Sequence, residues 1–172
     1  MRAMVLHGQA LIDTRPLRLE EVPEPAVGLH DVMVRIEACG ICRTDLHVIE
    51  GDLPPVKVPV IPGHQIVGRV VDRGGEAQRF EVGDRVGIAW LRETDGTCRY
   101  CLRGNENLCY YERTVRSVTA NTRQDGVELL ELAAAIPIRT HTVTFALDEA
   151  NEALYRLQHD QIRGAGVLLI VG

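Results

Sequence analysis

The sequence predicts an α+β fold that is mainly β, with a small antiparallel barrel or sandwich followed by two helices. Short β-branched runs such as DVMVRIEACG, GHQIVGRVVDRG and GDRVGIAW alternate with Gly and Pro breaks, which is typical of such barrels. Most of the 16 glycines and 8 prolines lie before residue 110, and the last third of the chain reads as more helical. A chain of 172 residues can bury a sizeable core as one domain, or as one domain with a lobe.

The C-terminal third is expected to hold two helices and two strands. Thr122 can cap a helix through GVELLELAAA, which Pro137 ends, and HTVTFAL then alternates like a strand. Asp148 is the expected N-cap of the second helix, and GVLLIV is a buried closing strand. One face of that helix has apolar residues at the i, i+3, i+4, i+7 spacing, namely Ala150, Ala153, Leu154 and Leu157. We expect both helices to pack their apolar faces on the barrel.

Charge and hydropathy exclude several classes of partner. The formal charge of −5, from 19 basic and 24 acidic side chains, includes no long run of one sign, so we expect neither nucleic acid nor a membrane surface as partner. The N-terminal apolar run is too short for a signal peptide, and no stretch is long enough to span a membrane, which predicts a cytoplasmic protein. Five cysteines in such a chain are better interpreted as metal ligands or reactive thiols than as a disulfide framework.

Three of the cysteines lie in the stretch TDGTCRYCLRGNENLC, at positions 98, 101 and 109. A closed tetrahedral zinc site needs four ligands, and a two-residue gap counted back from Cys98 reaches Asp95, whose carboxylate can complete the set. The spacing therefore predicts a structural zinc site made of Asp95, Cys98, Cys101 and Cys109. The alternative is that Asp95 only forms an Asx turn ahead of Gly96 and that the thiols hold no metal.

A second polar cluster lies in ACGICRTDLHVIEGDLP and PGHQIVG. A catalytic zinc takes a thiolate, an imidazole and one more protein ligand, with the fourth position open, and Cys42 and His64 are the candidates. Alternatively, His64 is an ordinary turn histidine, or Cys39 and Cys42 form a redox Cys-x-x-Cys pair. The redox hypothesis is weakened by the absence of the βαβ context that such a motif needs.

These motifs together resemble one family. ACGICRTDLHVIEGDLP, IPGHQIVGRVV, FEVGDRVGIAWL and CRYCLRGNENLC are similar to the zinc-dependent alcohol dehydrogenases of the medium-chain dehydrogenase/reductase superfamily, whose catalytic domain is a GroES-like β-barrel. The resemblance implies that residues 1–109 form the N-terminal portion of this catalytic domain, with a structural-zinc lobe at 90–109. Residues 110–172 resemble the C-terminal segment of the same domain.

The resemblance also implies roles for single residues. Cys42 and His64 would be catalytic zinc ligands, and Asp45 would orient the histidine, whereas Cys39 would have no ligand role. Thr44 and His47 would form the proton relay.

The cofactor and substrate contacts follow from the same resemblance. Arg43 would meet the cofactor pyrophosphate, and Trp90 and Leu53 would line the substrate pocket, although large apolar side chains are also common in cores. The implied reaction interconverts a small alcohol and an aldehyde with hydride exchange to NAD or NADP, assisted by zinc.

The sequence departs from this family pattern at three points. Asp95 stands where the structural site usually has its first cysteine, and Gln65 follows His64 where the family usually has Glu. The third departure is the nucleotide-binding domain with its Gly-rich turn, which we expect to be absent. The only G-x-G is Gly164-Ala165-Gly166, with Leu169 in place of the last glycine, and the third catalytic cysteine of the family is also missing.

We therefore expect the dehydrogenase activity of this chain to be impaired or lost, since correct positioning of reactants can contribute about 7 to 11 kcal/mol of barrier reduction. The alternative function is a non-redox zinc-binding module with one structural zinc. A third hypothesis keeps a metal in the pocket, with Gln65, water or a carboxylate as third ligand, as a hydrolytic or lyase-like Lewis acid. An incomplete barrel that exposes apolar surface would also favour a homo-oligomer.

Overall fold

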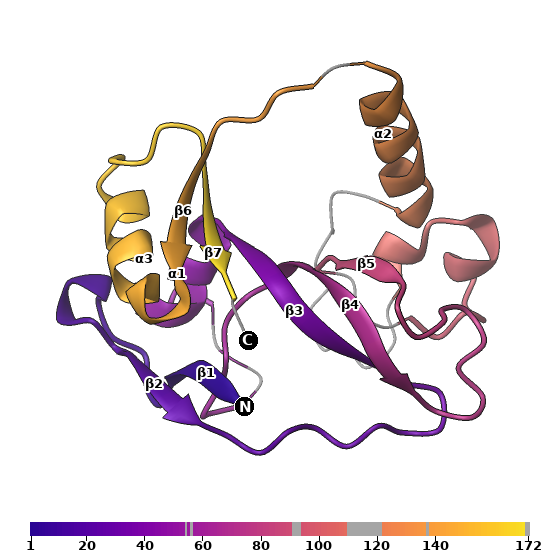
Figure 1. The fold of residues 1–172 in the computed structure, drawn as a ribbon, viewed down its shortest axis with the longest axis horizontal. Coiled ribbons are helices and arrows are strands. Elements are labelled where there is room, and N and C mark those ends of the chain that lie inside the picture. Colours follow the sequence, from indigo (N-terminus) through magenta and orange to yellow (C-terminus); the bar gives the residue numbers. More distant parts are fainter. Residues whose placement is uncertain (54, 56, 91–93, 110–121, 137, 171–172) are drawn as a thin grey trace. The chain divides into compact units, whose positions relative to one another are not determined.

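The structure of the chain, a computed structural model, describes residues 1–170 except 54, 56, 91–93, 110–121 and 137 (Figure 1). The chain divides into two compact units, which are described separately. The first comprises Met1–Gly87 together with His141–Gly172, and the second comprises Ile88–Thr140. The boundary expected between 1–109 and 110–172 borders a stretch outside the described residues, and it stays a prediction.

Two sheets organise the strands. Strands β1 (Arg2–Leu6) and β2 (Leu17–Glu21) pair antiparallel in a sheet of their own. The other sheet has the order β5-β4-β3-β7-β6 (Figure 1). Its strands are β3 (Val32–Ile41), β4 (Gln65–Arg73), β5 (Arg85–Ile88), β6 (Thr142–Ala146) and β7 (Ala165–Leu169).

The central strand of this sheet is β3, which runs antiparallel to both β4 and β7, whereas β6 runs parallel to β7. The strands expected from HTVTFAL and GVLLIV are thus confirmed. The described strands form no closed barrel, because β1 and β2 hydrogen-bond to each other in a separate sheet. The expected mixed fold is confirmed, and in the described residues it is an open one.

The core of the first unit lies where both sheets meet helices α1 (Arg43–Glu50) and α3 (Ala150–Gln158). As predicted, α3 buries one face, and Leu157 packs at its edge. Its expected N-cap was wrong. Asp148 lies inside a 3-10 turn, and Glu149 occupies the cap position while its carboxylate accepts the Ala146 N–H at 2.7 Å. The buried core residues are Met4, Leu6, Ile12, Leu17, Ile41, Leu46, Ile49, Phe145, Ala150, Ala153, Leu154 and Leu168.

Helix α1 was not among the predicted helices, although local chemistry explains it. Cys42 is its N-cap, and its sulfur accepts the Thr44 N–H at 3.3 Å while the Asp45 carboxylate accepts the Cys42 N–H at 2.9 Å. This is a capping box in which a thiol replaces the usual hydroxyl. Gly51 ends the helix with φ of 104°, a left-handed conformation that favours glycine.

The second unit contains short 3-10 turns at Cys101–Arg103 and Glu106–Leu108, and helix α2 (Arg123–Ala135). The predicted cap is confirmed, since Thr122 Oγ1 accepts the Asp125 N–H at 3.2 Å. Within the second unit no α2 residue is buried, and the expectation that this helix packs its apolar face on the barrel stays a prediction, because the barrel strands belong to the first unit. Pro137, the expected end of the helix, lies outside the described residues, and no described helix is long and apolar enough to cross a membrane.

Candidate metal centres

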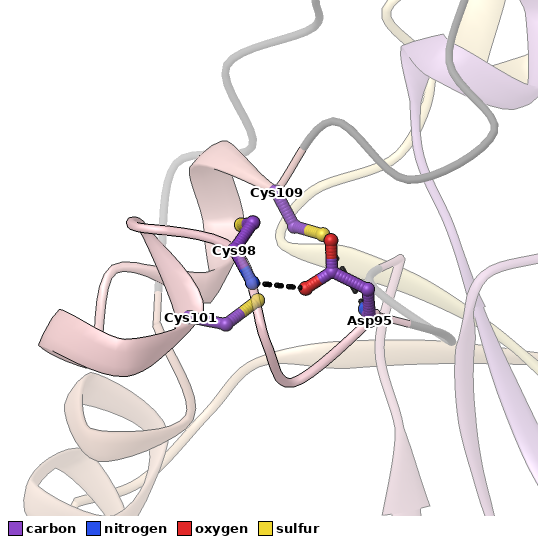
Figure 2. A group of neighbouring side chains, drawn as sticks. All are labelled: Asp95, Cys98, Cys101 and Cys109. Carbon is purple, nitrogen blue, oxygen red and sulfur yellow. Dashed lines mark hydrogen bonds between the residues drawn. The ribbon is translucent and has the colours of Figure 1, made fainter.

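One cluster of possible ligands lies on the cysteine-rich loop of the second unit. Figure 2 shows its four side chains, Asp95, Cys98, Cys101 and Cys109. One ligand atom from each lies within 4.8 Å of all the others. Cys98 and Cys109 are buried, and the other two side chains are partly buried. The four residues singled out by spacing alone are therefore brought together around one point.

Asp95 uses one carboxylate oxygen to shape the loop. Its Oδ1 accepts the N–H of Cys98 at 2.8 Å (Figure 2). It also accepts the N–H of Thr97 at 2.8 Å, which makes an Asx turn, and Gly96 lies inside this turn at φ of 66°. The Asp95 N–H in turn donates to Cys109 Sγ at 3.5 Å. The Asx turn is thus present, and it engages Oδ1 without preventing a cation from binding Oδ2, so both alternatives for the thiols stay open.

The cluster has a characteristic charge state without a cation. The N–H groups of Cys98 and Thr97 lower the pKa of the Asp95 carboxyl to about 2, so it is ionised at neutral pH. Desolvation, followed by hydrogen bonds to Cys109, Cys98 and Asp95, raises the pKa of the Cys101 thiol to about 12. Three sulfurs and one oxygen form a donor set that suits zinc, and a bound dication would favour the thiolates that this crowding disfavours.

A second cluster lies in the first unit, where α1 begins and β4 begins. His64 Nδ1 lies 3.0 Å from Asp45 Oδ1, and His64 Nε2 lies 3.2 Å from Cys42 Sγ. Because a carboxylate accepts, we assign the ring proton to Nδ1, which leaves the Nε2 lone pair facing the sulfur. One sulfur and one nitrogen thus converge as a metal site requires, with the carboxylate behind the imidazole.

Asp45 is the buried anchor of this cluster, since only 5% of its surface is exposed. Burial raises the pKa of its carboxyl, although the Cys42 N–H and the neighbouring His64 act in the opposite direction. Both oxygens are engaged, Oδ1 by His64 and Oδ2 by the Cys42 N–H. The same side chain therefore caps α1 and fixes the orientation of the imidazole.

The expected relay and cofactor residues follow on α1. Thr44 and His47 lie one turn apart, hence on one side of the helix, and His47 Nδ1 lies 2.7 Å from Asp52 Oδ2. Asp52 was not among the predicted site residues. It could have been found, since a glycine cap at 51 turns the chain back toward the last turn of the helix. The Arg43 guanidinium donates to Asp160 Oδ1 at 2.7 Å, and the two side chains form an exposed ion pair.

The remaining predicted residues are not brought to these clusters. Leu53 and Trp90 are 40% and 44% exposed and belong to different units, so their pocket role stays a prediction. Gln65 is exposed, and its side chain lies against Gly40, where a Cβ atom would come within 2.6 Å of the Gln65 Oε1. Cys39 is buried, and its thiol lies 3.4 Å from the Gly40 carbonyl oxygen.

Comparison with known proteins identifies the class to which this fold and these clusters belong. Residues 28–131, more than half of the chain, match the model of the alcohol dehydrogenase GroES-like domain. The chain belongs to this family, within the zinc-dependent alcohol dehydrogenases of the medium-chain dehydrogenase/reductase superfamily.

The curated relatives agree. A probable alcohol dehydrogenase AdhA of Mycobacterium tuberculosis (strain CDC 1551 / Oshkosh) is 53% identical over 109 residues, which are 59% of this chain and 31% of the relative. An alcohol dehydrogenase of Rhizobium meliloti (strain 1021) is 41% identical over 127 residues, which are 73% of this chain and 37% of the relative. The matched part thus spans about a third of the length of these relatives.

Solved structures give the same result. A cobalt- and zinc-bound thermostable alcohol dehydrogenase from Pyrobaculum aerophilum is 30% identical with a TM-score of 0.59, over 64% of this chain and 32% of that one. The structure of AibC has a TM-score of 0.85 at 16% identity, over 100% of this chain and 96% of that one, and this likeness concerns the fold alone.

Proposed function

We propose that this chain carries the zinc-binding catalytic portion of an alcohol dehydrogenase, which in the intact protein interconverts a small alcohol and an aldehyde with NAD or NADP. The observation that supports it is the chain of contacts from Asp45 through His64 to Cys42. A carboxylate that fixes the tautomer of an imidazole, with the other ring nitrogen beside a thiol, is the arrangement that metal-binding histidines use. For zinc, the donor chemistry fits.

In this proposal each residue has one task. Cys42 Sγ and His64 Nε2 hold the metal, and Asp45 orients the imidazole. When bound, zinc lowers the pKa of a substrate hydroxyl. Thr44 and His47 move the released proton toward solvent, and the bond from His47 Nδ1 to Asp52 leaves Nε2 as the nitrogen that exchanges it. His47 is exposed, which suits the solvent end of a relay.

Arg43 is the proposed anion contact for the cofactor. Its guanidinium is paired with Asp160 on the loop after α3, and a phosphate would have to compete with that carboxylate. The two side chains are 52% and 85% exposed, and an ion pair in such a setting contributes about 0 to 1 kcal/mol. Competition by a doubly charged pyrophosphate is therefore feasible. Leu53 and Trp90 remain proposed contacts for the apolar part of the substrate.

A second candidate function is a non-redox zinc-binding module with one structural zinc on the loop. The observation that favours it is the difference between the clusters. The loop offers four ligand side chains, whereas the other cluster offers three, of which Asp45 already has both oxygens in hydrogen bonds. Zinc with Asp95, Cys98, Cys101 and Cys109 would be closed to substrate and would stabilise the loop.

Metal analysis separates the two functions. We expect about two zinc ions per wild-type chain if both clusters bind and about one if only the loop does. Cys42→Ala should then remove one zinc in the first case and none in the second, while Asp95→Ala should lower the loop content in both. An unchanged count in Asp95→Ala would refute the fourth-ligand assignment.

Calorimetric titration with NAD and NADP tests the dehydrogenase part. Binding at millimolar cofactor that is weakened in Arg43→Ala would support a cofactor contact on this chain. If wild type gives no heat with either nucleotide, this chain alone is no dehydrogenase. The cytoplasmic location and the homo-oligomer remain predictions. Size-exclusion chromatography can test the homo-oligomer.

A further inference from the structure

A cavity of about 160 Å³ lies inside the first unit, and none of the roles proposed above uses it. Its walls come from β1, β2, β3, β4, β7, α1, α3 and the segment around Ile61. Most of them are apolar and well buried, including Ala3, Met4, Leu17, Ala150, Leu154 and Leu168. The half-exposed side chain of Ile61 lies at the rim.

The buried polar side chains on these walls already have partners, and the charged groups that also line the cavity belong to two exposed residues, Arg2 and Met1, whose terminal amine donates to the Val22 carbonyl oxygen at 2.6 Å. Asp45 is the buried carboxylate that lines the cavity, and its oxygens are taken by His64 Nδ1 and the Cys42 N–H. The Cys39 thiol also lines it, and its sulfur lies 3.4 Å from the Gly40 carbonyl oxygen. A buried water needs two to four polar partners, and apolar cavities of about 150 Å³ in other proteins stay dry and bind benzene.

We propose that this cavity binds a small, uncharged, apolar molecule of about the size of a benzene ring. The volume fits one such ring, and the apolar walls replace its water shell without leaving a polar group unpaired. A charged or strongly polar ligand is disfavoured in the buried part of the cavity, where Asp45 and Cys39 are the polar side chains, since Arg2 and Met1 are exposed. The site is separate from the Cys42–His64 contact, because neither of these residues lines it, and it shares only the Asp45 wall.

The methionines provide a direct reporter of occupancy. The chain has three, of which Met1 and Met4 line the cavity and Met33 on β3 does not. With the methionine methyl groups labelled with ¹³C, benzene should shift the Met4 signal saturably at millimolar concentration, because an aromatic ring shifts nuclei that it touches. The Met33 signal should stay in place.

Two matched variants locate the ligand. Ala150 lines the cavity and is 2% exposed, so Ala150→Leu should fill it and abolish the shift of Met4 by benzene. Ala134 is an exposed residue of α2, and Ala134→Leu should leave that shift unchanged. Equal shifts of Met4 and Met33, or no saturable shift in folded wild type, would overturn the proposal whether or not Ala150→Leu folds. Undiminished binding by a folded Ala150→Leu variant would overturn it too.

Discussion

At the scale of single residues, Asp45 caps helix α1 with one carboxylate oxygen and orients the His64 imidazole with the other. Asp45→Asn can still accept the Cys42 N–H through its amide oxygen, but its NH₂ would face His64 Nδ1. The imidazole proton should then move to Nε2, the nitrogen beside Cys42 Sγ. We expect zinc affinity at this site to fall about 10- to 100-fold, as for other residues that orient metal-binding histidines. Competition with a chromophoric chelator measures this change.

A control separates orientation from folding. Asp45→Ala loses the helix cap as well, and we expect it to lower the free energy of unfolding by about 1 kcal/mol more than Asp45→Asn. Nitrogen-15 NMR of His64 in the metal-free protein should show the Nδ1–H tautomer in wild type and the Nε2–H tautomer in Asp45→Asn. Identical tautomers in both would contradict the assigned role of Asp45.

The loop cluster predicts how zinc binding depends on pH. The Cys101 thiol, with a pKa of about 12, keeps its proton across the neutral range, whereas Asp95, with a pKa of about 2, has already lost its own. Zinc must displace thiol protons, so its affinity should rise with pH, about tenfold per unit for each proton released. Asp95→Cys adds a protonated ligand and should steepen this dependence.

Calorimetric titration with zinc, repeated in buffers of different ionisation enthalpy, counts the protons that the protein releases when zinc binds. Asp95→Asn serves as the control, since it removes a carboxylate that carries no proton near neutral pH and should leave the number of protons unchanged. A zinc affinity that does not vary with pH would show that the Cys101 thiol is not a ligand.

The two clusters show what a sequence can predict at this scale. The Cys98-x-x-Cys101 spacing identified candidate ligands because a short turn confines them, and the structure places those side chains together. The contact between Cys42 and His64 spans 22 positions, and the two residues were paired by the donor chemistry that a catalytic zinc needs and by the family resemblance, not by spacing. Asp52 was missed as the partner of His47 because that contact depends on where α1 ends.

At the scale of elements, Glu106 joins the loop to α2. It is 7% exposed, and its Oε1 accepts the Arg123 N–H at 2.7 Å, at the first residue of the helix. Glu106→Ala leaves this N–H without its acceptor, so we expect the second unit to lose about 1 to 3 kcal/mol of stability. Urea denaturation at neutral pH measures it. Glu128→Gln, on the exposed surface of α2, is the matched control with little expected effect.

The pKa of Glu106 should also make the stability of the second unit depend on acidic pH. Burial acts to raise the pKa of the Glu106 carboxyl, but the hydrogen bond and charge of Arg123 outweigh it, so the pKa lies below its usual 4.5. The unfolded chain therefore takes up the proton first as pH falls. The stabilisation is complete above about pH 4.5 and is lost as pH drops through the folded pKa. Glu106→Gln should reduce this loss, and equal acid sensitivity in both proteins would contradict it.

The elements also show where sequence patterns mislead. The apolar spacing of α3 predicted its buried face, because tertiary packing covers that face. Helix α2 was predicted from its cap and its run of apolar residues, and within the second unit Leu129, Leu130 and Leu132 are 59%, 72% and 55% exposed. Periodicity shows which side of a helix is apolar, and it does not show whether any element covers that side. Helix α1 was missed because eight residues with a thiol cap give a weak periodic signal.

At the scale of the whole molecule, the alternation of apolar and polar residues and the turn residues predicted most of the strands. They did not predict how these strands pair into sheets. Closure depends on hydrogen bonds between strands distant in sequence, and the pairing of β1 with β2 in a separate sheet replaces the expected barrel. The pairing of β3 with β7 is a case in point, since it joins Ala38 to Leu169. No local pattern encodes such a contact.

The division into two units predicts that the metal clusters act separately on stability. Trp90 is the only tryptophan, and it belongs to the unit Ile88–Thr140 that also holds Cys101, whereas Cys42 belongs to the other. A structural zinc contributes folding free energy to the element that holds it. We therefore expect Cys101→Ser to lower the urea midpoint of the Trp90 fluorescence transition in zinc-loaded protein, and Cys42→Ser to leave it unchanged. Removing zinc with a chelator should abolish the difference between Cys101→Ser and wild type. If Cys42→Ser lowered the Trp90 midpoint as much as Cys101→Ser, the units would unfold as one, and the stabilisation could not be assigned to the loop.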